Sequence, residues 1–438
     1  MKGASYENNH DPCRVGRGIR LNAARLQEAY YQLPDVFAPP EYRSFGDKEG
    51  RALWAFLCHR ALTGKENPCL RPMLAALPTH TNAGGFFGPI HTGRDGDVMV
   101  DEFQFGGSTW YLRALCEAHR QLGDDCIPGT TPLALAKRVF EGLYLPALGL
   151  FDSYPIDHEE LTGDMFGNEL RVGNWILCSD IGAAFLGIDG VADYYIATGD
   201  VRAYDLVREM TECFARIDKL KIKAQTHATL SAVRGLLRMY EHTGDKRFAD
   251  VASDTWNLYI TQGMTATYAN FNWFGRGETW TEPCAVVDSL IVALHMYRLF
   301  GKQRDLTLAR RIWHNGMSSG QRSNGGAGTD TCVTPHVPFL HTGNIYEAYF
   351  CCTMRLSEGF LWAKQNEDLL SIEIPDLPLR DNEGRYMAGD LIYGEISPAD
   401  EAGSAVQVDG HTLSPLPKVF RLSEIRAVNT QTQVIFTE

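Results

Sequence analysis

The sequence lacks the segments by which several classes of protein are recognised. No stretch of the 438 residues approaches the roughly 18 unbroken apolar residues of a membrane span, and the opening MKGASYENNHDPC has no apolar core of the kind that directs export. No run rich in lysine and arginine is present, and the formal net charge of -13 is spread along the chain. We therefore expect a cytoplasmic protein that binds neither a membrane nor nucleic acid.

A disulfide framework is also missing. The chain has 11 cysteines, an odd number, and most stand singly inside helical patterns. Cys213, for example, continues an apolar helical stripe that includes Met210. Two places break this pattern, namely Cys284 in TEPCAVVDSL and the adjacent pair Cys351 and Cys352. With 44% hydrophobic residues, the chain can fold around a sizeable core without cross-links.

Glycine turns divide much of the chain into helical hairpins. A glycine just beyond a helix end takes the left-handed conformation at little cost, and the next helix starts after it. Together with a sixth helical segment around residues 353–365, these turns predict six pairs of helices closed into an (α/α)6 toroid; an open array fits the same pattern. The turn glycines are Gly64, Gly123, Gly199, Gly244 and Gly301.

The pattern changes near residue 369 to the alternation of β-strands, with Asp409-Gly410 as a two-residue hairpin turn. We therefore expect an N-terminal extension of residues 1–20, a mainly α toroidal domain of residues 21–368, and a small β-rich appendage of residues 369–438. A toroid keeps its site in the loops between hairpins. One such loop holds Trp273 and Trp280, whose flat rings suit stacking on sugars; core packing is the alternative.

The stretch TEPCAVVDSL places a carboxylate and a thiol at the start of a helix. Because Pro283 is tolerated at the first helical position, Glu282 lies at the cap and Cys284 in the first turn. Cys351 and Cys352 stand at the entrance of the helix expected at residues 353–365. If the two entrances face each other, three sulfurs and one carboxylate oxygen converge, which is a reasonable tetrahedral zinc set. The spacing is not a common zinc-finger spacing, so zinc is one hypothesis at this point.

With TEPCAVVDSL followed by CCTMRLSEG on a chain of helical hairpins with a β appendage, the sequence resembles the beta-L-arabinofuranosidase family of glycoside hydrolases, family 127, over roughly residues 20–438. The resemblance implies an (α/α)6 catalytic domain and Zn2+ bound by Glu282, Cys284, Cys351 and Cys352. It also implies that Cys351 is the nucleophile of a retaining mechanism on a small furanoside-like sugar. A thiolate is a good nucleophile, and a metal holds it deprotonated at neutral pH.

The sequence departs from the family in two places. The family's general acid/base is a glutamate in a Gly-Glu pair before the metal-binding glutamate, and the corresponding stretch here, GMTATYANF, holds no carboxylate. Glu278 is the nearest candidate for that catalytic role, with a supporting or capping role as the alternative. Tyr349 stands where family members often have histidine.

Further residues are expected around the sugar. The resemblance implies a substrate-facing histidine at His227, although a buried or capping role fits equally well, and Asp288 is expected to orient a ligand or cap a helix. Asp101 and Glu102 are a charged loop pair that could reach the mouth of the site, but we expect them to be solvated. The candidate substrate-binding residues are His227, Trp273, Trp280, His336 and Tyr349.

Two other classes of function fit the same residues. A toroidal carbohydrate epimerase or unsaturated-uronide hydrolase would use histidine or aspartate without metal chemistry. A non-enzymatic glycan-binding protein would use the four zinc ligands as a structural clip, since structural zinc has four protein ligands and no open position. A zinc site facing a cavity lined by Trp273, Trp280 and His227 favours the glycosidase, and a site sealed between helices favours the clip.

Overall fold

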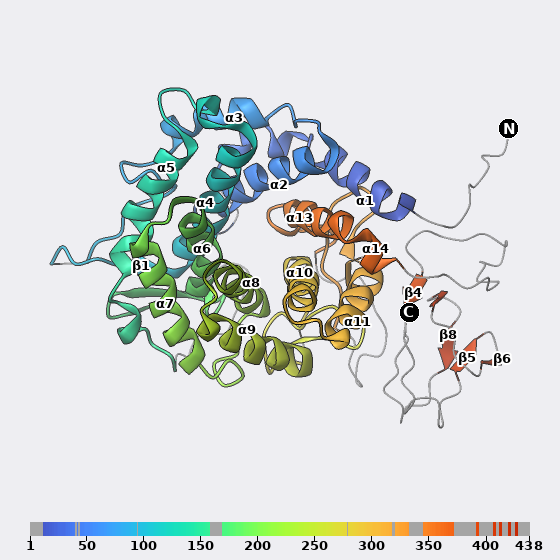
Figure 1. Cartoon of the computed structure of the whole chain (residues 1–438). Coiled ribbons are helices and arrows are strands. Elements are labelled where there is room, and N and C mark those ends of the chain that lie inside the picture. Colours follow the sequence, from blue (N-terminus) through green and yellow to red (C-terminus); the bar gives the residue numbers. More distant parts are fainter. Residues whose placement is uncertain are drawn as a thin grey trace.

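The computed structural model describes residues 12–39, 42, 44–93, 95–157, 169–277, 279–317, 320–332 and 345–371, and short strands between residues 391 and 427. The described chain is mainly helical (Figure 1). Its α-helices are α1 (Pro12–Arg25), α2 (Asp47–Thr63), α3 (Leu70–His80), α4 (Glu102–Leu122), α5 (Pro132–Val139), α6 (Gly187–Thr198), α7 (Val201–Arg216), α8 (Thr226–Thr243), α9 (Lys246–Leu258), α10 (Pro283–Phe300), α11 (Gln303–Arg311), α13 (Cys352–Gln365) and α14 (Glu367–Leu370).

Among the described helices, six form a closed inner ring. Each packs on the next in the order α2, α4, α6, α8, α10, α13, and α13 packs back on α2 (Figure 1). The predicted toroid is therefore confirmed, and its closure excludes the open array. Helix α10 has the length and the mean hydropathy, 1.4, of a membrane span, but 78% of that window is buried inside the ring. Its composition is that of a helix surrounded by protein.

The outer layer follows the predicted glycine turns. Helices α7, α9 and α11 each pack on the inner helix that precedes them in the chain. At the three turns Gly199, Gly244 and Gly301 have φ of 70°, 73° and 67°, and the Gly199 amide donates to the Tyr195 carbonyl at 2.7 Å. This is the left-handed helix end that glycine favours.

A further outer helix comes from the N-terminal end of the sequence. Helix α1 packs on α13, and the Asn22 side-chain amide donates to the carbonyls of Gly325 at 3.0 Å and Thr353 at 2.9 Å. The predicted boundary between residues 20 and 21 falls inside α1. A boundary read from local pattern cannot reveal a helix pair whose members lie more than 300 residues apart.

Strands occur in two places. A small sheet in the order β1-β3-β2, which the sequence analysis did not predict, lies in the toroid. In the appendage Val408 pairs with His411, as expected for a two-residue turn at Asp409-Gly410. The appendage sheets pair β4 with β7, and β5 with β6 and β8. The strands are β1 (Val100–Asp101), β2 (Glu169–Val172), β3 (Trp175–Cys178), β4 (Leu391–Tyr393), β5 (Val406–Val408), β6 (His411–Leu413), β7 (Val419–Arg421) and β8 (Ile425–Ala427).

Candidate active site

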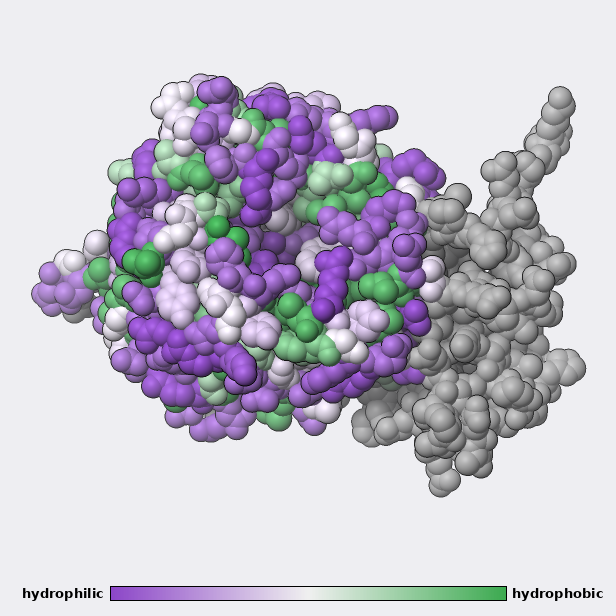
Figure 2. All heavy atoms as spheres, in the orientation of Figure 1, coloured by the Kyte–Doolittle hydropathy of each residue, from purple (hydrophilic) through white to green (hydrophobic). Residues whose placement is uncertain are grey.

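A cavity with an empty volume of about 750 Å³, part of it open solvent, is lined by residues at the N-terminal ends of the inner helices. Arg51 comes from the first turns of α2, His227 from α8, Glu282 from the cap of α10, and Cys351 and Cys352 from the entrance of α13. Figure 2 shows a hollow at the centre of the ring with hydrophilic residues around it. The ring therefore brings together side chains from segments far apart in the sequence.

The three cysteines that broke the helical pattern lie together beside this cavity, with Cys351 and Cys352 in its wall. The Sγ atom of Cys352 lies 3.3 Å from that of Cys284 and 3.4 Å from that of Cys351. Possible ligand atoms form two groups, each with all its atoms within 4.8 Å of one another. One is Cys284, Cys351 and Cys352; the other is His227, Glu282 and Cys284. Cys284 belongs to both groups, so the predicted carboxylate ligand Glu282 lies close to one of the three sulfurs. His227 is a further possible ligand, although the sequence analysis assigned it to substrate binding.

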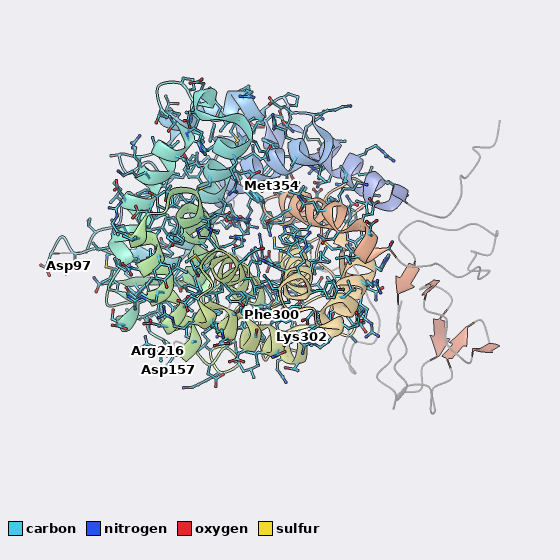
Figure 3. The ribbon with its side chains drawn as sticks, viewed as in Figure 1. Asp97, Asp157, Arg216, Phe300, Lys302 and Met354 are labelled. Carbon is cyan, nitrogen blue, oxygen red and sulfur yellow. The ribbon has the colours of Figure 1, made fainter. Side chains whose placement is uncertain are left out.

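Local helix chemistry explains how the two entrances are built. Glu282 is the cap residue of α10 with extended backbone, and Pro283 occupies the first helical position, as predicted. The Glu282 amide donates to the Asn270 side chain at 2.8 Å, which fixes the approach to the helix. Cys351 occupies the corresponding cap position of α13. Figure 3 labels Met354, which follows the cysteine pair, on the inner side of the ring.

Burial makes these ligand groups reluctant to ionise. It raises the pKa of the Cys284 and Cys352 thiols well above their usual range. Burial, reinforced by the negative charge of Asp180, raises the pKa of Glu282 to about 8. In the described part of the chain the buried Oε2 atom of Glu282 has no hydrogen-bond partner. A divalent cation would satisfy that oxygen and hold the thiols as thiolates, so the donors present fit zinc.

The hydrogen bonds of His227 define its tautomer. Arg51 Nη2 lies 3.2 Å from His227 Nε2. Because a guanidinium can only donate, Nε2 accepts, and Nδ1 carries the proton that it donates to Asp288 Oδ2 at 2.7 Å. Burial lowers the pKa of His227, and this effect outweighs the opposing effect of the Asp288 carboxylate. The imidazole ring is therefore neutral at neutral pH. The Nε2 lone pair thus faces the Arg51 guanidinium, and the Asp288 carboxylate on the other side of the ring fixes the orientation of the imidazole.

A buried ionic cluster holds Asp288 in place. Its Oδ1 accepts from Arg234 and Arg355, both at 2.6 Å. Glu358 pairs with the same two arginines and with Arg113, the last at 2.8 Å. Burial acts to raise the pKa of both carboxyl groups, but the arginines outweigh it and hold each pKa well below its usual range. The carboxylates therefore stay ionised, which fixes the orientation of the imidazole above them.

The other predicted substrate residues have different positions. Trp273 and Trp280 line the cavity, with their rings perpendicular and their centroids 5.0 Å apart. Tyr349 is not part of the described cavity wall and packs its ring against Tyr30 at 4.8 Å. Glu278 and His336 lie outside the described residues.

The expectation that Asp101 and Glu102 are solvated is wrong. Asp101 caps α4 by accepting from the Phe103 amide at 3.0 Å, and Glu102 accepts from the Tyr154 hydroxyl at 2.6 Å. Both acidic residues are buried. Hydrogen bonds from Tyr154 and Cys178, both distant in sequence, make the burial of Glu102 possible, and local sequence carries no signal of those partners.

Sequence reasoning also missed the cation in the site. Arg51 binds both carboxylate oxygens of Asp47, at 2.7 and 2.8 Å, and its Nη1 donates to Cys284 Sγ at 3.4 Å. Its guanidinium lies 4.6 Å from the ring centroid of Trp110. The spacing of Asp47 and Arg51 on one helical face was a visible signal of an ion pair, but nothing local places that pair at the cavity.

The closed double ring of helices defines the class of fold, and solved structures agree with it. The chain has a TM-score of 0.51 both with a glycoside hydrolase (14% identity, covering 82% of this chain and 59% of the other) and with the GH76 alpha-mannanase of Bacteroides thetaiotaomicron (12% identity, 83% and 98%). A polysaccharide lyase gives the same TM-score (10% identity, 82% and 99%). The molecule is an (α/α)6 toroid.

A comparison with family models indicates which protein family part of this chain resembles. Residues 188–362, from α6 to α13, match the family described as "Beta-L-arabinofuranosidase, GH127 catalytic domain". The resemblance stated from the motifs is thereby confirmed for this segment of the chain. No curated protein matches the chain. The chain spans less than two thirds of the length of the solved GH127 beta-arabinofuranosidase, 56%, and of the glycoside hydrolase above, 59%.

Proposed function

We propose that this protein is a retaining glycoside hydrolase acting on a small furanoside, with an L-arabinofuranoside as the first substrate to test. The observation that carries the proposal is the meeting of Cys284, Cys351 and Cys352 beside a cavity inside the segment that matches the GH127 catalytic domain. Cys351 is the nucleophile in this proposal. It is the half-buried member of the three and lines the cavity, whereas Cys284 is fully buried.

Zinc is the proposed cofactor, held by Glu282, Cys284, Cys351 and Cys352, with His227 as a further possible ligand. When bound, it would keep the thiols deprotonated at neutral pH. Cys351 then attacks the anomeric carbon, and Trp273 and Trp280 present apolar ring surface to the sugar. Arg51, held by Asp47, keeps a positive charge beside Cys284 throughout.

The position of the ligand groups argues against a purely structural clip. A clip is sealed between helices, whereas Glu282, Cys351 and Cys352 all line the cavity. The same wall contains His227, Trp273 and Trp280, which is the arrangement expected of a site that receives a sugar.

The test is hydrolysis of a panel of nitrophenyl furanosides and pyranosides by the wild type and Cys351→Ser, together with elemental analysis. We expect near-stoichiometric zinc, activity on at least one furanoside, and loss of that activity in the variant. An epimerase or a uronide hydrolase without metal chemistry would retain its activity in Cys351→Ser. Metal without turnover of any glycoside would favour the structural clip.

A further inference from the structure

An enzyme that hydrolyses one glycoside among many needs groups that recognise the hydroxyls of the sugar. The residues assigned above have other tasks, since Glu282 and the thiols are proposed to hold zinc and Arg51 is bound to Asp47. Trp273 and Trp280 offer apolar ring surface, which does not distinguish a hydroxyl group from its absence. Other polar side chains of the cavity wall must therefore recognise the hydroxyls.

Two carboxamide side chains line the described cavity, those of Gln225 and Asn272. Both residues are buried in the wall, with 5% and 4% of their surface exposed. A carboxamide donates and accepts hydrogen bonds, and a sugar hydroxyl does the same. Each of the two side chains can therefore bind a hydroxyl group without bringing a charge to the site.

Gln225 stands at the cap position of α8 without capping the helix. Its backbone is extended, as at an ordinary cap, but its side chain makes no hydrogen bond to the first turn. The backbone is fixed on both sides, because the Gln225 amide donates to the Ile181 carbonyl at 2.9 Å and the Gln225 carbonyl accepts from the Thr229 amide at 3.1 Å. The buried carboxamide thus lines the cavity and does not serve the helix end.

Asn272 differs in the same way from Asn270 on the same segment. The buried side chain of Asn270 donates to Thr226 Oγ1 at 2.9 Å and accepts from the Glu282 amide at 2.8 Å. The buried Oδ1 atom of Asn272 has no hydrogen-bond partner among the described residues. Buried amides are normally paired within the protein. Asn270 therefore holds the wall together, whereas Asn272 is available to a molecule in the cavity.

Backbone hydrogen bonds hold the segments of the two carboxamides side by side. Gln225 forms an isolated antiparallel bridge with Trp273, the residue after Asn272. The Asn272 carbonyl accepts from the Thr226 amide at 2.9 Å, and the Asn272 amide donates to the Trp280 carbonyl at 3.2 Å. Side chains that a rigid backbone already positions bind a ligand at a smaller entropic cost.

We propose that Gln225 and Asn272 bind hydroxyl groups of the sugar and so determine which glycoside is hydrolysed, an inference that rests on the function proposed above. A hydroxyl of the sugar donates to a side-chain oxygen and accepts from a side-chain nitrogen of this pair. A sugar that lacks the hydroxyl leaves the buried amide unpaired, which is the physical source of the discrimination. The chemistry recognised is that of a neutral, hydroxylated ring.

The test uses Asn272→Leu and Gln225→Met, which keep a similar shape and remove the hydrogen-bonding groups. The substrates are the nitrophenyl furanoside that the wild type hydrolyses and each singly deoxygenated analogue of it. The wild type should prefer the parent over at least one analogue by about 100-fold or more in kcat/KM. Each variant should reduce that preference by at least about tenfold. The ratio of two kcat/KM values does not depend on the fraction of enzyme that is folded.

Thermal unfolding separates recognition from a structural role. Asn272→Leu replaces an amide whose oxygen has no described partner, so its Tm should equal that of the wild type or exceed it. Asn270→Leu is the matched control, because it removes bonds to Thr226 and to the Glu282 amide and should lower the Tm. The exposed residue Asn257 provides a second control, and Asn257→Leu should keep the wild-type preference.

An unchanged preference in Asn272→Leu and Gln225→Met, or an equal loss on the parent and every analogue, overturns the recognition role. A fall in Tm for Asn272→Leu as large as that for Asn270→Leu overturns it as well, since the amide would then be part of the scaffold. If the wild type and Asn257→Leu hydrolyse no glycoside, the proposed function itself is wrong, and the recognition role with it.

Discussion

Two neighbouring regions both contain buried acidic groups. At the cavity floor, the group formed by Glu282, Cys284, Cys351 and Cys352, burial raises the pKa of the acids. In the ionic cluster behind it, arginines hold the pKa of the carboxyl groups low. Behind the floor, the buried carboxylates Asp288 and Glu358 are matched by Arg113, Arg234 and Arg355 at hydrogen-bond distance. This region has its counter-charges within the chain. Its groups ionise in the folded protein because the arginines more than offset the effect of burial.

At the cavity floor the acidic groups outnumber the cations of the described residues. Arg51 is the arginine that lines the described cavity wall together with Glu282, Cys351 and Cys352, and that guanidinium already binds Asp47. Burial consequently raises the pKa of Glu282 and of the thiols. The contrast indicates that the cluster is complete as a structural unit, whereas the acidic groups at the floor could hold a metal ion, as proposed above.

The largest expected effect comes from removing the proposed nucleophile, Cys351. Cys351→Ser should lower kcat on the furanoside that the wild type hydrolyses by at least about 10,000-fold, because the hydroxyl is a far weaker nucleophile than a thiolate. Steady-state kinetics with a nitrophenyl glycoside measure it. The control is Cys126→Ser, which alters a cysteine remote from the cavity lining. Retained activity in Cys351→Ser would rule out the thiolate mechanism.

The next expected effect concerns the proposed zinc. Cys284→Ser should reduce bound zinc from near one equivalent to a small fraction after dialysis, because Cys284 belongs to both groups of possible ligands. Elemental analysis provides the measurement. Cys69→Ala, which removes a thiol outside both groups, should keep the wild-type content. Equal zinc in the two variants would mean that the cation binds elsewhere.

A third change breaks the ionic cluster. Glu358→Gln removes the negative charge shared by Arg113, Arg234 and Arg355, and we expect the free energy of unfolding to fall by about 3 to 5 kcal/mol because buried cations lose their counter-ion. Urea unfolding measures the loss. Glu212→Gln, which breaks an exposed pair with Arg208, should cost at most about 1 kcal/mol. Similar losses in both variants would contradict the distinction between buried and exposed pairs.

The smallest effect appears as a pH dependence of the chelator-treated protein. The folded pKa of Glu282, about 8, lies above its ordinary value of 4.5, so between these values the folded state holds a proton that the unfolded state releases. This group therefore lowers stability progressively as pH rises from about 4.5 to about 8. Glu282→Gln should lose this component, which thermal unfolding at pH 5, 6.5 and 8.5 detects. Parallel profiles for variant and wild type would contradict the raised pKa.

Much of the fold was predictable because its signals are local. A glycine after an apolar stripe marks a helix end wherever the helix lies, and Gly199, Gly244 and Gly301 all adopt the expected left-handed conformation. The proline after Glu282 likewise identified the first turn of α10. The pairing of α1 with α13 was not predictable in this way, because no local pattern states which helix covers which.

The residues of the candidate site can also be separated into those that the local sequence identifies and those that only the fold brings together. Three cysteines at helix entrances were recognisable because they interrupt the helical patterns that other cysteines follow. Arg51 and Asp180 were not recognisable, since each is an ordinary charged residue until the ring closes and brings it to the cavity wall. Glu102 shows the reverse, because a loop carboxylate expected in solvent proved to be buried by partners from other segments.

The sequence by itself determined the helical hairpins, the β-strand appendage and the presence of thiols and a carboxylate at helix entrances, because backbone preferences and side-chain periodicity act over a few residues. Only the tertiary structure decided that these entrances face one cavity, and that arginines neutralise one set of acids and leave the other without such partners. Those decisions depend on distances between segments that closure of the ring alone establishes.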